Sequence, residues 1–366
     1  MNNMYITSGM LQKVLTESYL YCGKKKSFIE VVMEMYKEEK YITTKPTIPY
    51  ELLTYTLSDK KFEEFLYKLP ININNIIKLS SSTEIGESDI LSENSDILII
   101  RHFNYLSDKF HSHNYFEISY VFKGSCEFLF EKERCMLVEG ELCIVAPNSL
   151  HNIIVNDSDS IIIIIAIKKS TFDSSFFSLL SQKDLLSYFF RQILYKQTSP
   201  NYLLFSTNNS ADIKLTIKNL VMENYKGDIY FNNCSISWVN ILFANILRNH
   251  VKTIQFFNDN SENDFSEILQ YIQHNYRNLT LKNLAEHFHY SEAHLSTLIK
   301  KNIGLKFTSL ITKLKMADAK DYLINTNLSI EKVSEYVGYN SVDHFSRTFK
   351  KYYEKSPQQF RKSILI

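Results

Sequence analysis

An internal repeat near the C-terminus constrains the fold of this 366-residue chain more than any other feature. Residues 279–301 and 328–351 align with an offset of 49 positions, as in the pair Tyr290 and Tyr339, and after one inserted residue with an offset of 50, as in Leu295 and Phe345. The aligned positions have the apolar spacing of helices. Two copies of one helical supersecondary unit therefore lie in tandem.

Each copy has the pattern of two short helices joined by a tight turn. Hydroxyl residues stand where helix N-caps are expected, and these are Thr280 and Ser291 in the first copy and Ser329 and Ser341 in the second. Gly338 occupies the turn of the second copy, where a positive φ is expected, and His289 takes the equivalent place in the first. The pattern predicts two helix-turn-helix units, whose second helices can enter the major groove of DNA.

The second helix of each unit separates into an apolar and a polar face. In the second copy Phe345 and Phe349 are four residues apart and are expected to point inward. Arg347 on the opposite face is the leading base-reading candidate, because a guanidinium can bond a guanine edge bidentately, and lysines there suit phosphates. The predicted DNA-contacting residues are Ala293, Ser296, Thr297, Lys300 and Lys301 in the first copy and Val342, Asp343, Ser346, Arg347, Lys350 and Lys351 in the second.

A helical pattern over 306–325 connects the two copies. A helix of about 20 residues is about 30 Å long, and successive major-groove segments on one side of B-DNA are about 34 Å apart. The charge supports a polyanionic partner, since residues 262–366 contain 12 Lys and 3 Arg against 11 Asp and Glu, a net charge of +4 in a chain of +1. We therefore expect both units to bind one duplex.

The rest of the chain changes texture twice. Residues 1–90 are helical in pattern, and 91–170 hold seven short apolar runs typical of a small antiparallel barrel. Helical patterns return over 171–261, and 262–366 are all helical. The predicted fold class is therefore multi-domain α+β: an N-terminal helical extension, a β-barrel, a helical linker or dimerisation segment and a C-terminal tandem helix-turn-helix domain.

A stripe on the predicted helix of the linker segment has two interpretations. It is formed by Trp238, Ile241, Leu242 and Ile246, and such a stripe is either ordinary packing or the seam of a helix-paired dimer. The longest apolar run, 161–167, is far below the roughly 18 residues of a membrane span, and the five scattered cysteines lack a C-x-x-C pair. We expect a cytoplasmic homodimer that does not contact a membrane.

The C-terminal third resembles the AraC/XylS family of bacterial transcription regulators. The residues that carry the resemblance are Gly338, Tyr339, Phe345, Arg347, Phe349, Lys350, Ser356, Pro357, Phe360 and Arg361. Departures are Ser334 in place of alanine, Lys315 in place of arginine and Glu354 in place of glycine. The resemblance implies two helix-turn-helix units on double-stranded DNA and activation of transcription through contact with RNA polymerase.

The barrel segment resembles the two cupin motifs. Residues 111–124 contain His111, His113 and Glu117 at cupin spacing, and 140–151 resemble the second motif and end in His151, although it lacks the usual glycine. In metal-binding cupins such residues ligate one divalent ion. Cupin-like sensor barrels of the regulators implied above keep similar residues without metal, so we favour a metal-free pocket for an unknown small-molecule effector and expect no cofactor.

Three hypotheses follow. The favoured one is a ligand-responsive regulator, in which an effector bound in the barrel changes how the DNA-binding domain is presented. The second is a metal-dependent cupin enzyme with an accessory helical domain. The third is a constitutive DNA-binding protein whose barrel serves only dimerisation.

Overall fold

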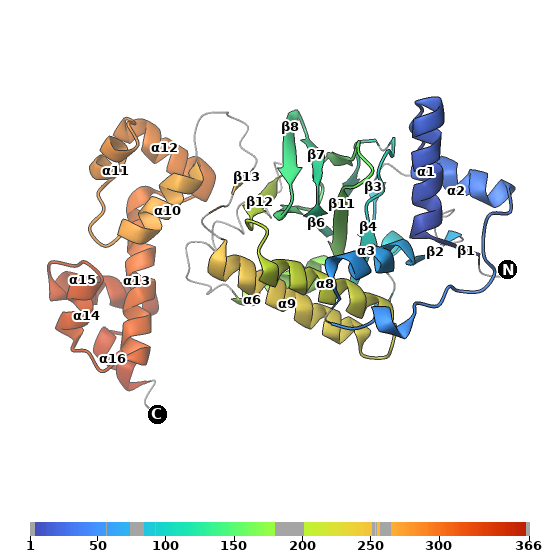
Figure 1. Cartoon of the computed structure of the whole chain (residues 1–366). Coiled ribbons are helices and arrows are strands. Elements are labelled where there is room, and N and C mark those ends of the chain that lie inside the picture. Colours follow the sequence, from blue (N-terminus) through green and yellow to red (C-terminus); the bar gives the residue numbers. More distant parts are fainter. Residues whose placement is uncertain are drawn as a thin grey trace. The chain divides into compact units, whose positions relative to one another are not determined.

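The computed structural model describes residues 4–55, 57–73, 84–91, 93–107, 109–179, 201–250, 253, 255–256 and 265–363. The chain divides into two compact units. The first contains the described residues within 1–179 and 197–258, and the second those within 259–366 (Figure 1). The first unit combines sheets with helices and the second is all helical. The predicted mixed α+β class with an all-α C-terminal domain is confirmed.

Two antiparallel sheets form the centre of the first unit. The larger has the strand order β13-β12-β9-β6-β11-β4 and the smaller β10-β7-β8, while β3 (Glu84–Ile85) pairs in parallel with β5 (Ser112–His113). The strands are β4 (Ile97–Arg101), β6 (Phe116–Lys123), β7 (Ser125–Phe130), β8 (Glu133–Val138), β9 (Glu141–Val145), β10 (His151–Ile154), β11 (Ile161–Ile167), β12 (Tyr202–Ser206) and β13 (Gln255–Phe256). All seven predicted strands are present.

The two faces of the larger sheet have different partners, because successive side chains of a strand point to opposite faces. On β6, Val121 belongs to an apolar cluster that also contains Phe128 of β7 and Leu137 of β8. This cluster lies between the two sheets, and we call it the inter-sheet core. The neighbouring Phe122 points the other way, and its ring centroid is 4.9 Å from that of Phe62. The second face is therefore covered by helices.

Helices from the N-terminal and central parts of the chain cover that second face (Figure 1). They are α3 (Asp59–Tyr67), α6 (Lys169–Leu179), α8 (Ala211–Lys226) and α9 (Phe231–Asn249). Phe172 of α6 stacks on Phe116 at a centroid distance of 3.7 Å, and the hydroxyl of Tyr225 in α8 donates a 2.9 Å hydrogen bond to the carbonyl of Ile99. Burial of these aromatic side chains fixes the helices on the sheet.

The N-terminal segment packs into the same unit. Its remaining elements are β1 (Tyr5–Thr7), α1 (Ser8–Cys22), α2 (Phe28–Lys37), the 3-10 helix η1 (Tyr50–Leu52), β2 (Pro70–Asn72) and α5 (Glu87–Ile90). Ile6, Leu11 and Val32 form one apolar cluster with Phe103 and Leu106 that follow β4. Besides its helices, this segment contains an antiparallel pair, β1 with β2.

The segment 171–261 was predicted to be helical, and this is wrong for two short stretches. β12 pairs with β9 along its whole length, and β13 pairs with β12. Leu203 and Phe205 of β12 are fully buried. These strands extend the larger sheet by two, because an open edge at β9 gains main-chain hydrogen bonds from an added strand.

The second unit consists of two helical groups on either side of one long helix (Figure 1). Its elements are α10 (Phe265–Asn275), α11 (Leu281–His287), α12 (Glu292–Ile303), α13 (Phe307–Asn325), α14 (Ile330–Tyr336), α15 (Val342–Tyr353) and α16 (Pro357–Lys362). α13 is the predicted connecting helix, and its 19 residues span about 28 Å. In the described part of the chain, no helix has the length and hydropathy to cross a bilayer.

Candidate DNA interface and ligand site

The sequence caps both copies of the repeat in the same way. The side chains of Thr280, Ser291, Ser329 and Ser341 each accept a hydrogen bond from the backbone N–H three residues later. Such caps satisfy donors that a helix start leaves without a partner and fix where each helix begins. All four predicted N-caps are confirmed, and α11–α12 and α14–α15 form the two helix-turn-helix units.

The turns between the paired helices need a left-handed residue. Gly338 has φ +78°, and a Cβ placed there would lie 2.1 Å from the carbonyl oxygen of Arg277. His289 adopts φ +58° at the equivalent place. The same backbone geometry is therefore reached with glycine in one copy and with a side chain in the other, at some conformational cost.

The second helix-turn-helix unit is held on α13 by polar contacts as well as by packing. Lys315 of α13 donates a 2.6 Å hydrogen bond to the carbonyl of Gly338, and its ammonium lies 5.1 Å from the ring centroid of Tyr339. The hydroxyl of Tyr353 donates to the carbonyl of Met316 at 3.1 Å. The guanidinium of Arg361 donates to the carbonyl of Leu328 at 2.6 Å. These contacts hold α14–α16 on one end of the connecting helix.

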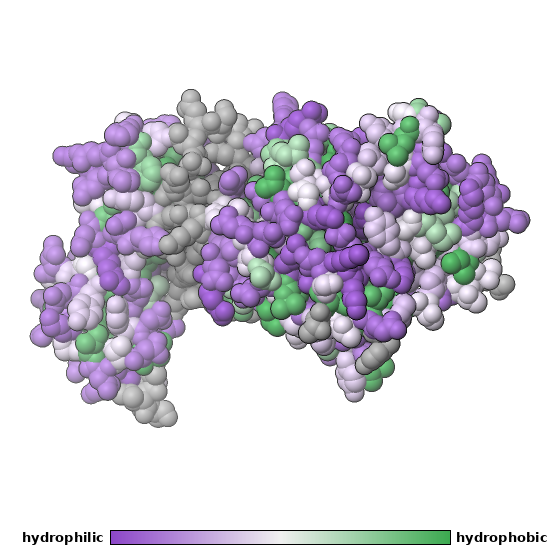
Figure 2. All heavy atoms as spheres, in the orientation of Figure 1, coloured by the Kyte–Doolittle hydropathy of each residue, from purple (hydrophilic) through white to green (hydrophobic). Residues whose placement is uncertain are grey.

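The polar faces of α12 and α15 are open to solvent. Phe345 and Phe349 are fully buried, as predicted. Among the predicted DNA-contacting residues, Ala293, Thr297, Lys300, Lys301, Asp343, Arg347, Lys350 and Lys351 are exposed, and Ser296, Val342 and Ser346 are partly exposed. On the face that Figure 2 shows, the surface over α14–α16 is mostly hydrophilic. We call these two polar faces the reading faces.

Sequence reasoning missed one residue on each reading face. His294 and His344 are both exposed, and each lies beside a tyrosine, with ring centroids 5.1 Å from Tyr290 and 5.4 Å from Tyr339. Their place in the first turn of α12 and α15 matches the part of a recognition helix that contacts base edges. The repeat alignment pairs the two histidines at an offset of 50 and could have identified them.

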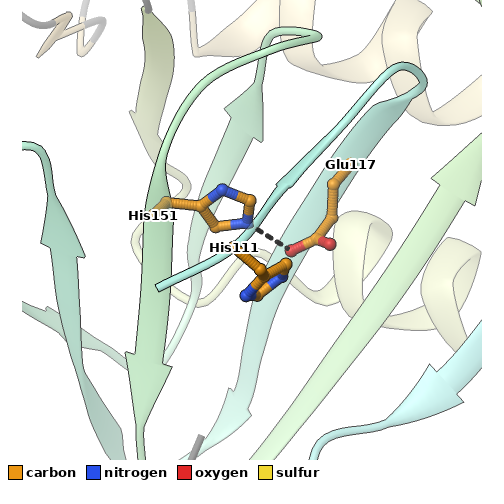
Figure 3. Close-up of side chains that lie close together, drawn as sticks. All are labelled: His111, Glu117 and His151. Carbon is orange, nitrogen blue, oxygen red and sulfur yellow. Dashed lines mark ion pairs between the residues drawn. The ribbon is translucent and has the colours of Figure 1, made fainter. Parts of the chain in front are cut away.

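Three of the predicted ligand-pocket residues, His111, Glu117 and His151, come together in the first unit (Figure 3). His111, Glu117 and His151 have ligand atoms that all lie within 4.8 Å of one another. The Nε2 atoms of His113 and His151 each lie 3.5 Å from the Glu117 carboxylate, one on each oxygen. His113 and His151 are fully buried, and Glu117 is 5% exposed. We call these four residues the His–Glu cluster.

Backbone contacts orient two of the imidazoles. The Nδ1–H of His113 donates to the carbonyl of Tyr115 and that of His151 to the carbonyl of Ser149, each at 2.9 Å. Their Nε2 atoms therefore face Glu117. Burial alone opposes ionisation of Glu117, but the contacts with His113 and His151 outweigh it and hold the pKa of the carboxyl well below its usual value. The cluster is thus an anionic group between imidazoles.

A tight turn places His151 in this cluster. Asn148 has φ +62° at the point where the cupin pattern has glycine, and its N–H donates a 2.7 Å hydrogen bond to the carbonyl of His113. Asparagine tolerates this left-handed conformation better than most residues. His111 and His151 then exchange backbone hydrogen bonds of 3.1 and 3.0 Å. The missing glycine does not disturb the convergence of the two motifs.

The cluster has the chemistry of either a ligand site or a metal site. Imidazole and carboxylate groups are common ligands of divalent transition metals. Backbone carbonyls hold the Nδ1 atoms of His113 and His151, as the partners of metal-binding histidines often do. The adjoining inter-sheet core is apolar and aromatic, with Phe128 and Tyr202 in edge contact at 5.3 Å. A polar end beside an apolar interior is typical of small-molecule sites.

Two family models match the chain in order along the sequence. A model described as "AraC-like ligand binding domain" matches residues 97–162, and one described as "Helix-turn-helix domain" matches 284–363. The first range contains the whole His–Glu cluster, and the second contains both reading faces.

Three curated proteins are similar to the chain. The raffinose operon regulatory protein RafR of Pediococcus pentosaceus is 33% identical over 34% of this chain and 46% of its own length. The Bacillus subtilis regulator YfiF is 26% identical over 70% of this chain and 80% of its own length. The lactose operon transcription activator of Staphylococcus xylosus is 31% identical over 28% and 37%. The chain thus spans less than half the length of two of these relatives.

Proposed function

Because the chain belongs to the AraC/XylS family of helix-turn-helix transcription regulators and has an AraC-like ligand-binding domain, we propose that it binds duplex DNA sequence-specifically in response to a small molecule. The observation that carries the proposal is the pair of capped recognition helices, α12 and α15, joined by a helix of about 28 Å. That length approaches the repeat of the major groove, about 34 Å.

The two reading faces have unequal roles in this proposal. Arg347 is exposed, and its Nε donates to the carbonyl of Asp343 at 3.3 Å. The outer nitrogens of the fork have no hydrogen bond within the described residues and can meet a base edge. Lys350 and Lys351 contact phosphates, as do Lys300 and Lys301. Ala293, Ser296 and Thr297 offer small side chains and contribute less discrimination. Val342, Asp343 and Ser346 complete the second face.

The effector site is the inter-sheet core with the His–Glu cluster at its polar end. We propose that the two sheets close around this core as a cupin-like barrel. The match of the ligand-binding family model to 97–162 supports an effector pocket over a catalytic centre, because this family consists of regulators rather than enzymes. The cupin enzyme hypothesis is therefore not retained.

The assembly in this proposal is a homodimer that contacts RNA polymerase as an activator. The S. xylosus relative is named an activator. The predicted stripe on α9 is divided between two faces, since Leu242 and Ile246 are fully buried whereas Ile241 is 42% exposed. Packing of α9 on its neighbours accounts for the buried half, and the exposed half with Trp238 is the proposed dimer seam.

DNA binding is tested by selecting a preferred duplex for the full chain and measuring affinity as a function of salt. Arg347→Ala should weaken binding by about 1–3 kcal/mol and relax preference at one base pair, whereas Lys350→Ala should weaken all sequences alike and reduce the salt slope by about 1. Lys13→Ala, on an exposed side chain of α1, serves as the control. An Arg347→Ala protein with unchanged affinity and site preference would remove Arg347 from the interface.

The His–Glu cluster is tested by metal analysis and by effector titration. We expect purified protein to contain less than one equivalent of divalent metal and a His111→Ala, His113→Ala variant to differ little. Stoichiometric metal that is lost on mutation would make the cluster a metal site. Sugars and carboxylic acids are then titrated into the protein–DNA complex. If none of them changes DNA affinity, the constitutive hypothesis is supported instead.

A further inference from the structure

Arg101, the last residue of β4, is buried without a polar partner among the residues that the structure describes. Arg101 is 2% exposed, and within the described part of the chain none of its three guanidinium nitrogens has a hydrogen bond. The ring of Tyr67 lies over it, with its centroid 4.4 Å from the guanidinium carbon. A buried cation is normally paired with an anion or with several acceptors. Arg101 therefore requires an explanation.

A second unpaired donor lies in the same row of the sheet. Ile163 of β11 pairs with Arg101 of β4 on one side and with Tyr120 of β6 on the other, so the three residues point to the same face. Tyr120 is fully buried, and its hydroxyl has no hydrogen-bond partner in the described ranges. Neighbouring strands are about 4.8 Å apart, so the backbones at Arg101 and Tyr120 are about 10 Å apart. Two long side chains can span that distance.

Helix α3 crosses above this row. Near its start Phe62 contacts Phe122 of β6, and at its end Tyr67 covers Arg101. Tyr67 is 38% exposed, so the ring that lies over the guanidinium is itself partly open to solvent. The face involved carries the helices and lies opposite to the face with Glu117, because residues 117 and 120 point to opposite sides of β6. The row is therefore separate from the His–Glu cluster.

We propose that Arg101 and Tyr120 form a second ligand site, for a small oxyanion carried by a carboxylate or a phosphate ester, beneath α3. The fork of a guanidinium matches two oxygens of either group, and the phenol supplies a further donor. Burial raises the pKa of Tyr120, which keeps that hydroxyl protonated as a donor at neutral pH. The ligand enters by displacement of Tyr67, so occupancy is coupled to the position of α3.

The test measures thermal stability of the full chain in sodium phosphate, sodium benzoate and sodium chloride at matched ionic strength. A ligand that binds only the folded protein raises Tm, and we expect a rise of about 2 °C or more with at least one of the two oxyanions. Phosphate alone would assign a phosphate ester, and benzoate alone a carboxylate. DNA is absent from the assay, so the result does not depend on the function proposed above.

Variants separate this site from general salt effects, because phosphate also stabilises proteins by exclusion from their surface. In Arg101→Met the oxyanion-specific rise should disappear, whereas Arg134→Met, which removes a 71% exposed guanidinium of β8, should keep it. Tyr120→Phe removes only a hydroxyl and should reduce the apparent affinity several-fold, which keeps the proposal testable if Arg101→Met fails to fold. An equal rise in wild type, Arg101→Met and Tyr120→Phe, or no rise in wild type with either oxyanion, overturns the proposal.

Discussion

The ammonium of Lys315 donates a 2.6 Å hydrogen bond to the carbonyl oxygen of Gly338. One end of the connecting helix thereby holds the turn of the second helix-turn-helix unit in place. Lysine stands here where the family pattern has arginine, and a single donor is enough because the turn presents one carbonyl. Burial lowers the pKa of Lys315, so the contact replaces solvation that the ammonium has lost.

Lys315→Met should destabilise the second helix-turn-helix unit by about 1–2 kcal/mol. The Gly338 carbonyl loses its hydrogen-bond donor, while methionine keeps the apolar part of the lysine side chain. Lys315→Arg should recover most of the loss, since a guanidinium can donate to the same oxygen. Urea unfolding of the full chain measures both changes. Lys362→Met, at an exposed position of α16, is the control and should change stability by less than about 0.5 kcal/mol.

Gly338→Ala should be more damaging than an ordinary substitution at a left-handed glycine. The new Cβ would clash with the Arg277 carbonyl, and the alanine would have an unfavourable φ. We therefore expect the free energy of unfolding to fall by more than about 2 kcal/mol. Gly227→Ala is the matched control, because φ is +69° there and no atom lies within 4 Å of the new Cβ, so only the conformational cost of about 1 kcal/mol remains. Equal losses in urea unfolding would contradict the steric argument.

Glu354→Gly should stabilise the second helix-turn-helix unit. Glu354 ends α15 at φ +62°, where glycine adopts the left-handed conformation without a steric penalty. The expected gain is about 1 kcal/mol in urea unfolding. The same substitution at Glu286, inside α11, should have the opposite sign, because glycine lowers helix stability there. A loss at both positions would show that the Glu354 side chain makes a favourable contact.

Glu117→Gln should lower stability in a pH-dependent way. The folded-state pKa of Glu117 lies well below its usual value, so the ionised carboxylate contributes stability above the unfolded pKa of about 4.3. That contribution is lost as pH falls through the folded pKa. Denaturation at several pH values should therefore show a difference of about 1–3 kcal/mol between wild type and variant at pH 7 that shrinks below about pH 4.

Glu93→Gln is the control for this series, because Glu93 is exposed. Its stability should follow that of wild type across the same pH range. A constant difference between Glu117→Gln and wild type from pH 7 to pH 3 would mean that packing of the residue, rather than its charge, stabilises the sheet.

Much of the architecture could be predicted from residue patterns. The helix caps at Thr280, Ser291, Ser329 and Ser341 follow from hydroxyl residues placed before apolar periodicity, which is a local signal. β12 was not predicted, because its five residues lie within a segment of helical pattern. Its strand conformation comes from pairing with β9. A short apolar run does not distinguish strand from helix when the partner is distant in sequence.

The candidate sites show the same division. His111, His113, Glu117 and His151 could be grouped from spacing, because the segments that contain them resemble the two cupin motifs. Arg101 could not be identified in this way. Its burial depends on Tyr67, which is 34 positions earlier in the sequence and on a separate helix. Nothing in the sequence of residues 97–101 distinguishes Arg101 from an ordinary exposed arginine at the end of a strand.

In the proposed mode of binding, in which both helix-turn-helix units contact one duplex, α13 has a consequence for promoters. A rigid connecting helix fixes the rotation of the two helix-turn-helix units relative to each other. The two DNA sites that they recognise, here called boxes, must therefore keep their rotational relationship around the duplex. Insertion of about 5 base pairs between the boxes turns one of them by half a helical turn, away from its reader. Single base changes within a box should then weaken regulation gradually, whereas small insertions between the boxes should abolish it. The promoters that this protein regulates should therefore conserve the spacing of the boxes more strictly than their base sequence.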